Sequence, residues 1–193
     1  MYKKQMTFQR IVCMALLAAC VIVFIYSLGL MTDLYDGVYQ TYRNGVSRVD
    51  GGEIYMNMQE FNRQLTGMSI VMLLVGLFNF VMGTNSRRKY YIGNYVSIAL
   101  SVICNIGISV WALLQIMNFK QDYLKIDFAA LEQQLSTRAN AYFTTSTFWF
   151  DASFVVFGFV FLVTALLIVN LVLKISVMNS EKRLIGSRKD VRA

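Results

Sequence analysis

Four long stretches of the chain are almost entirely apolar. Three of them contain no charged residue, and the last contains only Asp151 near its start and Lys174 near its end. Because about 20 mostly apolar residues suffice for a helix to cross a bilayer, the pattern predicts four transmembrane helices in a single membrane domain. The last stretch is longer than one crossing requires, so we expect it to tilt or to project beyond the membrane. The stretches cover residues 11–31, 65–82, 92–117 and 148–177.

The two segments that separate the first span from the second and the third from the fourth predict a small cap. Residues 32–64 begin as a continuation of the first helix, then form a hairpin around Asp50-Gly51-Gly52, and become helical again from about Asn57. Residues 118–147 contain a second short helix, for which Asp127 is the expected cap. Its apolar face consists of Phe128, Leu131 and Leu135. The expected fold is therefore an all-α bundle of four transmembrane helices with a small extracellular cap.

Charge predicts the orientation of this bundle. The segments before residue 11, between 83 and 91, and from Lys174 onward contain 12 basic residues and two acidic ones. The remaining segments contain six basic and nine acidic residues. By the positive-inside rule, both termini lie in the cytoplasm and the chain is a multi-pass protein of the cell membrane. The same asymmetry explains a pI near 9.4, and because the basic residues are dispersed, it argues against a nucleic-acid partner.

Composition narrows the possible chemistry. The chain is 56% hydrophobic and 15% charged, its mean hydropathy is +0.51, and it contains no histidine. Its three cysteines, Cys13, Cys20 and Cys104, all fall within predicted spans, so we expect neither an extracellular disulfide framework nor a metal site. No nucleophile is paired with a base, and no phosphate-binding loop is present. We therefore expect a protein that is not an enzyme and that needs no cofactor.

The third span contains a polar stripe. Asn94, Ser97, Ser101 and Asn105 recur at steps of three or four, and Ser109 continues the same face. Amides and hydroxyls in hydrocarbon need partners, so this face should contact protein or water. Three interpretations remain open: packing inside the bundle, contact with a partner protein, and the lining of a water-filled path.

Smaller polar signals occur in the second and fourth spans. Asn79 lies between Gly76 and Gly83 on one face of the second span, and Asn170 is a candidate contact residue in the fourth, together with Thr164. Asp151 is the only acidic residue within a predicted span. Its position near a helix start favours a stabilising role there, or an ion pair with Lys120, Lys125 or Arg138, over ion coupling.

Four segments are spread over most of the chain: YSLGLMTDLYD (26–36), SRRKYYIGNY (86–95), STFWFD (146–151) and EKRLIG (181–186). Through these segments the chain resembles an uncharacterised family of small four-span membrane proteins of Gram-positive bacteria, encoded near carbohydrate ABC importers. Because the spans contain no titratable core and no cofactor motif, whereas the segments outside them are sizeable, we expect a non-enzymatic accessory subunit that packs against a larger membrane complex. The resemblance implies a carbohydrate ABC importer as that complex, with transporter subunits as partners besides the lipid bilayer. A self-assembling channel or facilitator, whose pore the polar stripe of the third span would line, is the alternative, so a homo-oligomer remains possible.

Overall fold

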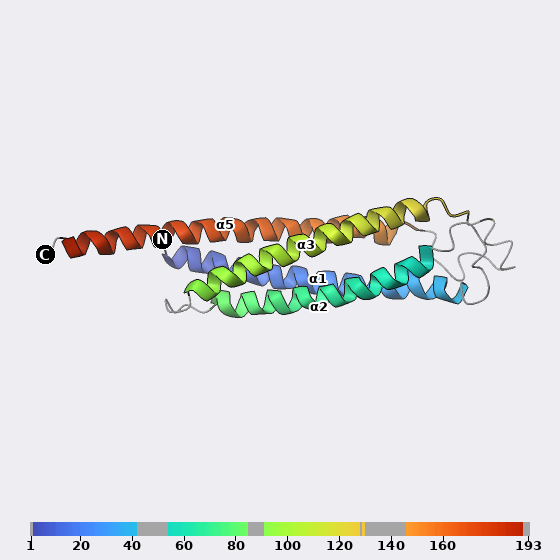
Figure 1. Cartoon of the computed structure of the whole chain (residues 1–193), viewed down its shortest axis with the longest axis horizontal. Coiled ribbons are helices and arrows are strands. Elements are labelled where there is room, and N and C mark those ends of the chain that lie inside the picture. The colour runs from blue at the N-terminus through green and yellow to red at the C-terminus, as the bar shows by residue number, and fades with distance from the viewer. Residues whose placement is uncertain (1, 42–53, 85–90, 128, 130–145, 191–193) are drawn as a thin grey trace.

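The protein is an elongated bundle of four long helices that run alternately up and down (Figure 1). The computed structural model describes residues 2–41, 54–84, 91–127, 129 and 146–190. Each helix contains a stretch long and apolar enough to cross a membrane, which confirms the expected all-α fold of a four-span integral membrane protein. The helices are α1 (Tyr2–Thr41), α2 (Ile54–Thr84), α3 (Tyr91–Tyr123) and α5 (Phe148–Asp190).

All four helices are longer than the apolar stretches that predicted them. The first helix begins at Tyr2 rather than at residue 11, and it continues to Thr41, as expected for the start of the first outer segment. The predicted hairpin is wrong in its second half, because residues 54–56 already belong to α2. The rest of the hairpin lies outside the described residues. The short helix predicted within residues 118–147 also lies outside the described residues, except for its expected cap, Asp127. Asp127 Oδ1 accepts a hydrogen bond from the backbone nitrogen of Ala129 at 3.0 Å.

The helix α5 projects beyond the rest of the bundle, as its length predicted. It contains 43 residues, and its C-terminal part extends past the N-terminus of α1 (Figure 1). The bundle therefore has two distinct ends. We call the end near both chain termini the terminal end, and the end at which α5 begins the opposite end. The charge pattern predicts that the terminal end is cytoplasmic.

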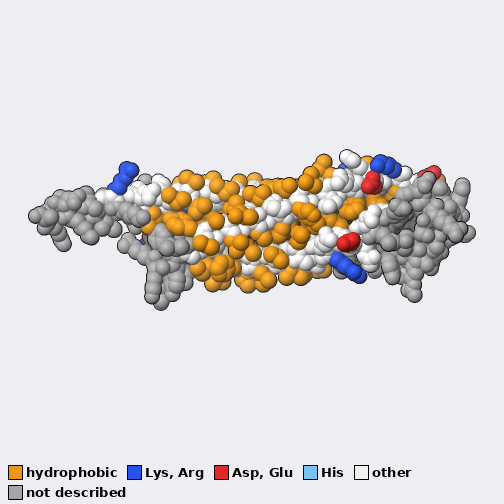
Figure 2. All heavy atoms as spheres, viewed as in Figure 1, with side chains coloured by type: hydrophobic (Ala, Val, Ile, Leu, Met, Phe, Trp, Pro, Cys, Tyr) orange, Lys and Arg blue, Asp and Glu red, His pale blue; other side chains and the backbone are white. Residues whose placement is uncertain are grey.

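Around the bundle axis, α1 and α3 each pack against both α2 and α5. The outside is apolar over most of its length (Figure 2), with exposed side chains such as Ile103 and Val155. The interior contains polar side chains together with apolar ones, whereas the outside of the spans is apolar; this differs from the ordinary soluble pattern and is typical of helices in lipid. The buried polar side chains of the interior include Gln5, Gln9, Ser27, Asn62, Ser69, Asn79, Asn94, Ser97, Ser101, Asn105, Ser109, Ser153, Thr164 and Asn170.

Glycines allow α1 and α2 to approach closely. A Cβ atom added to Gly83 would lie 2.7 Å from Cys13 Sγ, and one added to Gly76 would lie 3.2 Å from Cys20 Sγ. Both cysteines are buried, as expected for small apolar side chains in a packed interface. Seven residues, or about two helical turns, separate the glycines as they separate the cysteines. The two pairs therefore fix the distance between α1 and α2 at two levels.

Candidate functional site

Four amide side chains join all four helices near the terminal end. Gln9 Nε2 donates to the carbonyl of Gly83 at 3.0 Å and to Asn94 Oδ1 at 3.3 Å. Gln5 Nε2 donates to Gln9 Oε1 and to Asn170 Oδ1, each at 3.1 Å. The network thus connects α1 with α2, α3 and α5, and every side chain in it is buried. Such bonds fix the register of helices that have no hydrophobic drive to associate in lipid.

The polar stripe of α3 continues from this network towards the middle of the bundle. Asn94 Nδ2 donates to the carbonyl of Met82 at 2.9 Å, and Ser97 Oγ lies 3.3 Å from Asn79 Oδ1. Ser101 Oγ donates to the carbonyl of Ser97. This half of the stripe therefore holds α3 against the last turns of α2.

The second half of the stripe has fewer partners. Asn105 Oδ1 lies 3.9 Å from Cys20 Sγ, which donates a weak hydrogen bond from α1. Within the described residues, Asn105 Nδ2 and Ser109 Oγ make no hydrogen bond, and neither does Thr164 Oγ1. Because all three residues are almost completely buried, these atoms are enclosed polar groups rather than solvated ones.

The structure brings six of the seven predicted contact residues together inside the bundle. Their exposed fractions lie between 0% and 3%, so the side chains face neighbouring helices of the same chain. Among the three interpretations of the stripe, this placement agrees with packing inside the bundle. It does not present the stripe to the lipid, where a partner would reach it. The six residues are Asn79, Asn94, Ser97, Ser101, Asn105 and Asn170.

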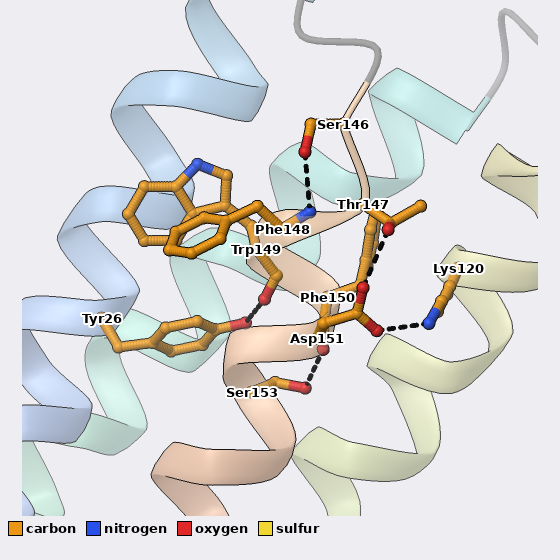
Figure 3. Close-up of polar contacts among 9 residues, drawn as sticks. All are labelled: Tyr26, Lys120, Ser146, Thr147, Phe148, Trp149, Phe150, Asp151 and Ser153. Atoms are coloured by element: carbon orange, nitrogen blue, oxygen red, sulfur yellow. Dashed lines mark hydrogen bonds and ion pairs between the residues drawn. The ribbon is translucent and has the colours of Figure 1, made fainter.

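Asp151, the seventh residue, lies on the surface where α5 begins (Figure 3). Its carboxylate pairs with Lys120 Nζ of α3, which is one of the three partners that the sequence suggested. The second carboxylate oxygen accepts a hydrogen bond from Thr147 Oγ1 at 2.8 Å, and Ser146 Oγ accepts one from the backbone nitrogen of Phe148 at 3.2 Å. A serine cap and an acid in the first turn both stabilise a helix start. Asp151 therefore anchors the beginning of α5 to α3.

Tyr26 and Trp149 anchor the same turn of α5 to α1. Tyr26 Oη donates to the carbonyl of Trp149 at 2.9 Å, and the two ring centroids lie 6.1 Å apart (Figure 3). The indole lies over Gly29, where an added Cβ would approach it to 2.5 Å. The ring of Trp149 therefore packs against α1. We call the contacts of Tyr26, Lys120, Trp149 and Asp151 the outer clamp.

Removing the hydroxyl of Tyr26 should weaken the outer clamp measurably. We expect Tyr26→Phe to lower the free energy of unfolding by about 1 kcal/mol, the typical contribution of one hydrogen bond. Tyr26→Leu should cost more, because it also removes the ring contacts with Trp149 and Phe157. Reversible unfolding of the purified protein in mixed micelles measures both values. Equal stability of Tyr26→Phe and the parent would contradict the role given to this hydroxyl.

The sequence missed several interior residues because they lie outside the uncharged stretches or are small. Gln5 and Gln9 precede residue 11 and so lie outside the apolar stretch that predicts the first span, yet both are buried. Ser27 and Ser69, whose hydroxyl oxygens lie 3.4 Å apart, connect α1 with α2. A signal was present, since buried positions recur along α1 at steps of three or four from Gln5 through Gln9 to Leu30.

The arrangement supports helix packing more readily than covalent chemistry. In the described part of the chain, no group of three histidine, cysteine, aspartate or glutamate residues could hold a metal ion. The interior offers amides, hydroxyls and thiols, which form hydrogen bonds between helices. Comparisons with protein-family models, with curated proteins and with solved structures each find no match for this chain.

Proposed function

We propose that this chain is a non-enzymatic accessory subunit that packs laterally against a larger membrane complex. One observation carries the proposal: the six amide and hydroxyl side chains that the sequence suggested for contact are turned inward, whereas the large exposed side chains of the spans are apolar. A bundle that uses its polar groups on itself is a self-contained scaffold. Its remaining means of action are its lipid-facing surface, its outer segments and the projecting end of α5.

The lipid-facing surface includes small residues suited to close helix contact. Gly107 on α3 and Gly158 on α5 are exposed, and a Cβ atom added to either would meet no atom within 4 Å. Small residues let the backbones of two helices approach in lipid, where packing drives association. We therefore assign the partner contact to these outward glycine positions and to the neighbouring surface around Asp151, in place of the inward stripe.

A carbohydrate ABC importer is the host that we propose for the subunit. The support for this choice is the resemblance carried by four segments of the sequence, among them residues 146–151 at the outer clamp. In that setting the bundle would steady the permease subunits within the bilayer. The alternative, a channel between copies of the chain lined by the stripe of α3, is less favoured because the stripe faces α1 and α2 within one bundle.

Copurification from native membranes tests the proposal. A tagged chain should recover permease and ATP-binding subunits of one importer in a fixed stoichiometry. Gly107→Leu and Gly158→Leu should each fold normally, because both side chains would enter open space, and at least one should reduce that recovery severalfold. Leu114→Ile, an exchange at another exposed position of α3, is the matched control. Recovery of the chain alone as a symmetric homo-oligomer would contradict an accessory role.

A further inference from the structure

Several buried asparagines of the bundle have an amide nitrogen without a hydrogen-bond partner among the described residues. Asn79, Asn105 and Asn170 each use the amide oxygen as an acceptor, towards Ser97, Cys20 and Gln5 respectively. In all three asparagines, the amide nitrogen makes no hydrogen bond within the described residues. Exchanging the amide oxygen and nitrogen would only transfer the deficit from one atom to the other. Each asparagine therefore needs one further partner.

Ser109 shows the same deficit in a second kind of group. Buried serines in helices commonly donate to a backbone carbonyl three or four residues earlier. Ser69, Ser97 and Ser101 do so at 2.7 to 2.9 Å, whereas the hydroxyl of Ser109 makes no hydrogen bond in the described structure. Ser109 follows Asn105 by four residues, which places the two side chains next to each other on one face of α3. Two unpartnered polar groups are thus neighbours in the interior, and both have an exposed fraction of 0%.

We propose that the bundle binds water in its interior, with Asn105 and Ser109 as the principal site and the amide nitrogens of Asn79 and Asn170 as two further sites. Water is the smallest ligand that accepts a hydrogen bond from an amide nitrogen and also exchanges one with a hydroxyl. Buried water occurs where two to four polar groups converge, and Asn105 with Ser109 supplies two of them. Acyl chains offer no acceptor, so lipid cannot satisfy these groups.

The sites are separate rather than parts of one continuous water path. Buried apolar side chains, including Leu16, Ile98 and Leu167, lie among the polar ones in the interior. A permeation path would need polar or wide surroundings along its whole length, whereas isolated waters need only local partners. Water bound at these sites takes part in the packing of the helices, independently of the proposed accessory role.

Hydroxyl-radical footprinting by X-ray radiolysis tests the principal site, because side chains beside bound water are oxidised even when they are buried. Cys20 is the reporter, since its Sγ lies 3.9 Å from Asn105 Oδ1. Met14, which is on the same helix and 62% exposed towards the lipid, is the internal reference. A cysteine thiol is intrinsically more reactive than a methionine, so the ratio of the two rates is referred to that of the unfolded chain. In lipid nanodiscs, mass spectrometry of the full chain should show a ratio of Cys20 to Met14 oxidation that is severalfold higher than in the unfolded chain.

Variants separate bound water from general access. Asn105→Leu and Ser109→Ala should each reduce the oxidation rate of Cys20 severalfold, whereas the lipid-facing control Ile103→Leu should leave it unchanged. If Asn105→Leu fails to fold, as judged by its elution profile and helical content, Ser109→Ala provides the test. A ratio of Cys20 to Met14 oxidation no higher than that of the unfolded chain would overturn the proposal. An oxidation rate of Cys20 that neither Asn105→Leu nor Ser109→Ala changes would also overturn it.

Discussion

Replacing Gly83 with leucine should cost at least about 3 kcal/mol of folding stability, at or beyond the upper end of ordinary overpacking effects. The Cβ atom alone would approach Cys13 Sγ to 2.7 Å and Gln9 Nε2 to 3.4 Å. The remaining carbons of leucine would have to displace α1 from α2. The same displacement would break the hydrogen bond between Gln9 and the carbonyl of Gly83. Thermal unfolding of the purified protein in detergent, followed by circular dichroism, measures the loss.

Gly107→Leu is the matched control, because it makes the same change on a lipid-facing position. A Cβ atom at Gly107 meets nothing within 4 Å, so the larger side chain enters open space and should leave the unfolding transition within experimental error of the parent. The contrast between the two variants isolates packing from the general effect of replacing a helical glycine. Similar stability losses in both would show that α1 and α2 do not approach as closely at Gly83 as described.

Exchanging Asn105 for aspartate should also be severely destabilising, although the two side chains have nearly the same size. Asn105 is completely buried in the uncharged part of α3. An ionised carboxylate at such a depth costs about 3 kcal/mol on scales derived from membrane insertion. Cys20 Sγ, the hydrogen-bonding partner of the Asn105 side chain, supplies no compensating positive charge. The folded fraction in a refolding titration reports the change.

Two controls accompany Asn105→Asp. Asn105→Leu should change the stability by less than about 1 kcal/mol, because interhelical hydrogen bonds in membranes contribute little on average. Asn118→Asp places the same acid on an exposed position of the same helix and should be tolerated. Equal effects of aspartate at residues 105 and 118 would show that Asn105 is accessible to bulk water.

The fold was predictable because a helix that crosses lipid must meet two simple requirements. A span must be apolar outside and must satisfy its backbone internally, so the four apolar stretches predicted the helices and their number. The lengths of the helices were less predictable. The continuation of α1 to Thr41 was expected, but neither its start at Tyr2 nor the extension of α5 from residue 177 to Asp190 follows from hydropathy, because these residues are polar. Hydropathy reports where lipid surrounds a helix and does not report where the helix ends.

The composition of the interior was only partly predictable. The polar stripe of α3 was recognisable because Asn94, Ser97, Ser101 and Asn105 stand out against apolar neighbours. The direction in which the stripe faces was not predictable, because one sequence is compatible with a polar face turned towards its own bundle and with one turned towards a partner protein. The partners from α1 were missed because Gln5 and Gln9 precede the apolar stretch. Three-dimensional register, which the Gln9–Gly83 and Cys20–Asn105 contacts define, was needed to identify them.

The length of α5 makes it a lever arm. Its 43 residues correspond to a rod of about 65 Å at 1.5 Å per residue, and the chain contains no proline that would introduce a kink. The contacts of the outer clamp hold the first turn of α5 against α1 and α3, whereas the last turns of α5 lie beyond the other helices (Figure 1). A tilt of only about 5° at the clamp would swing the far tip by about 6 Å, given that length. Because α5 is one continuous helix packed against α1 and α3, a displacement of its first turn relative to these helices would also displace its projecting end.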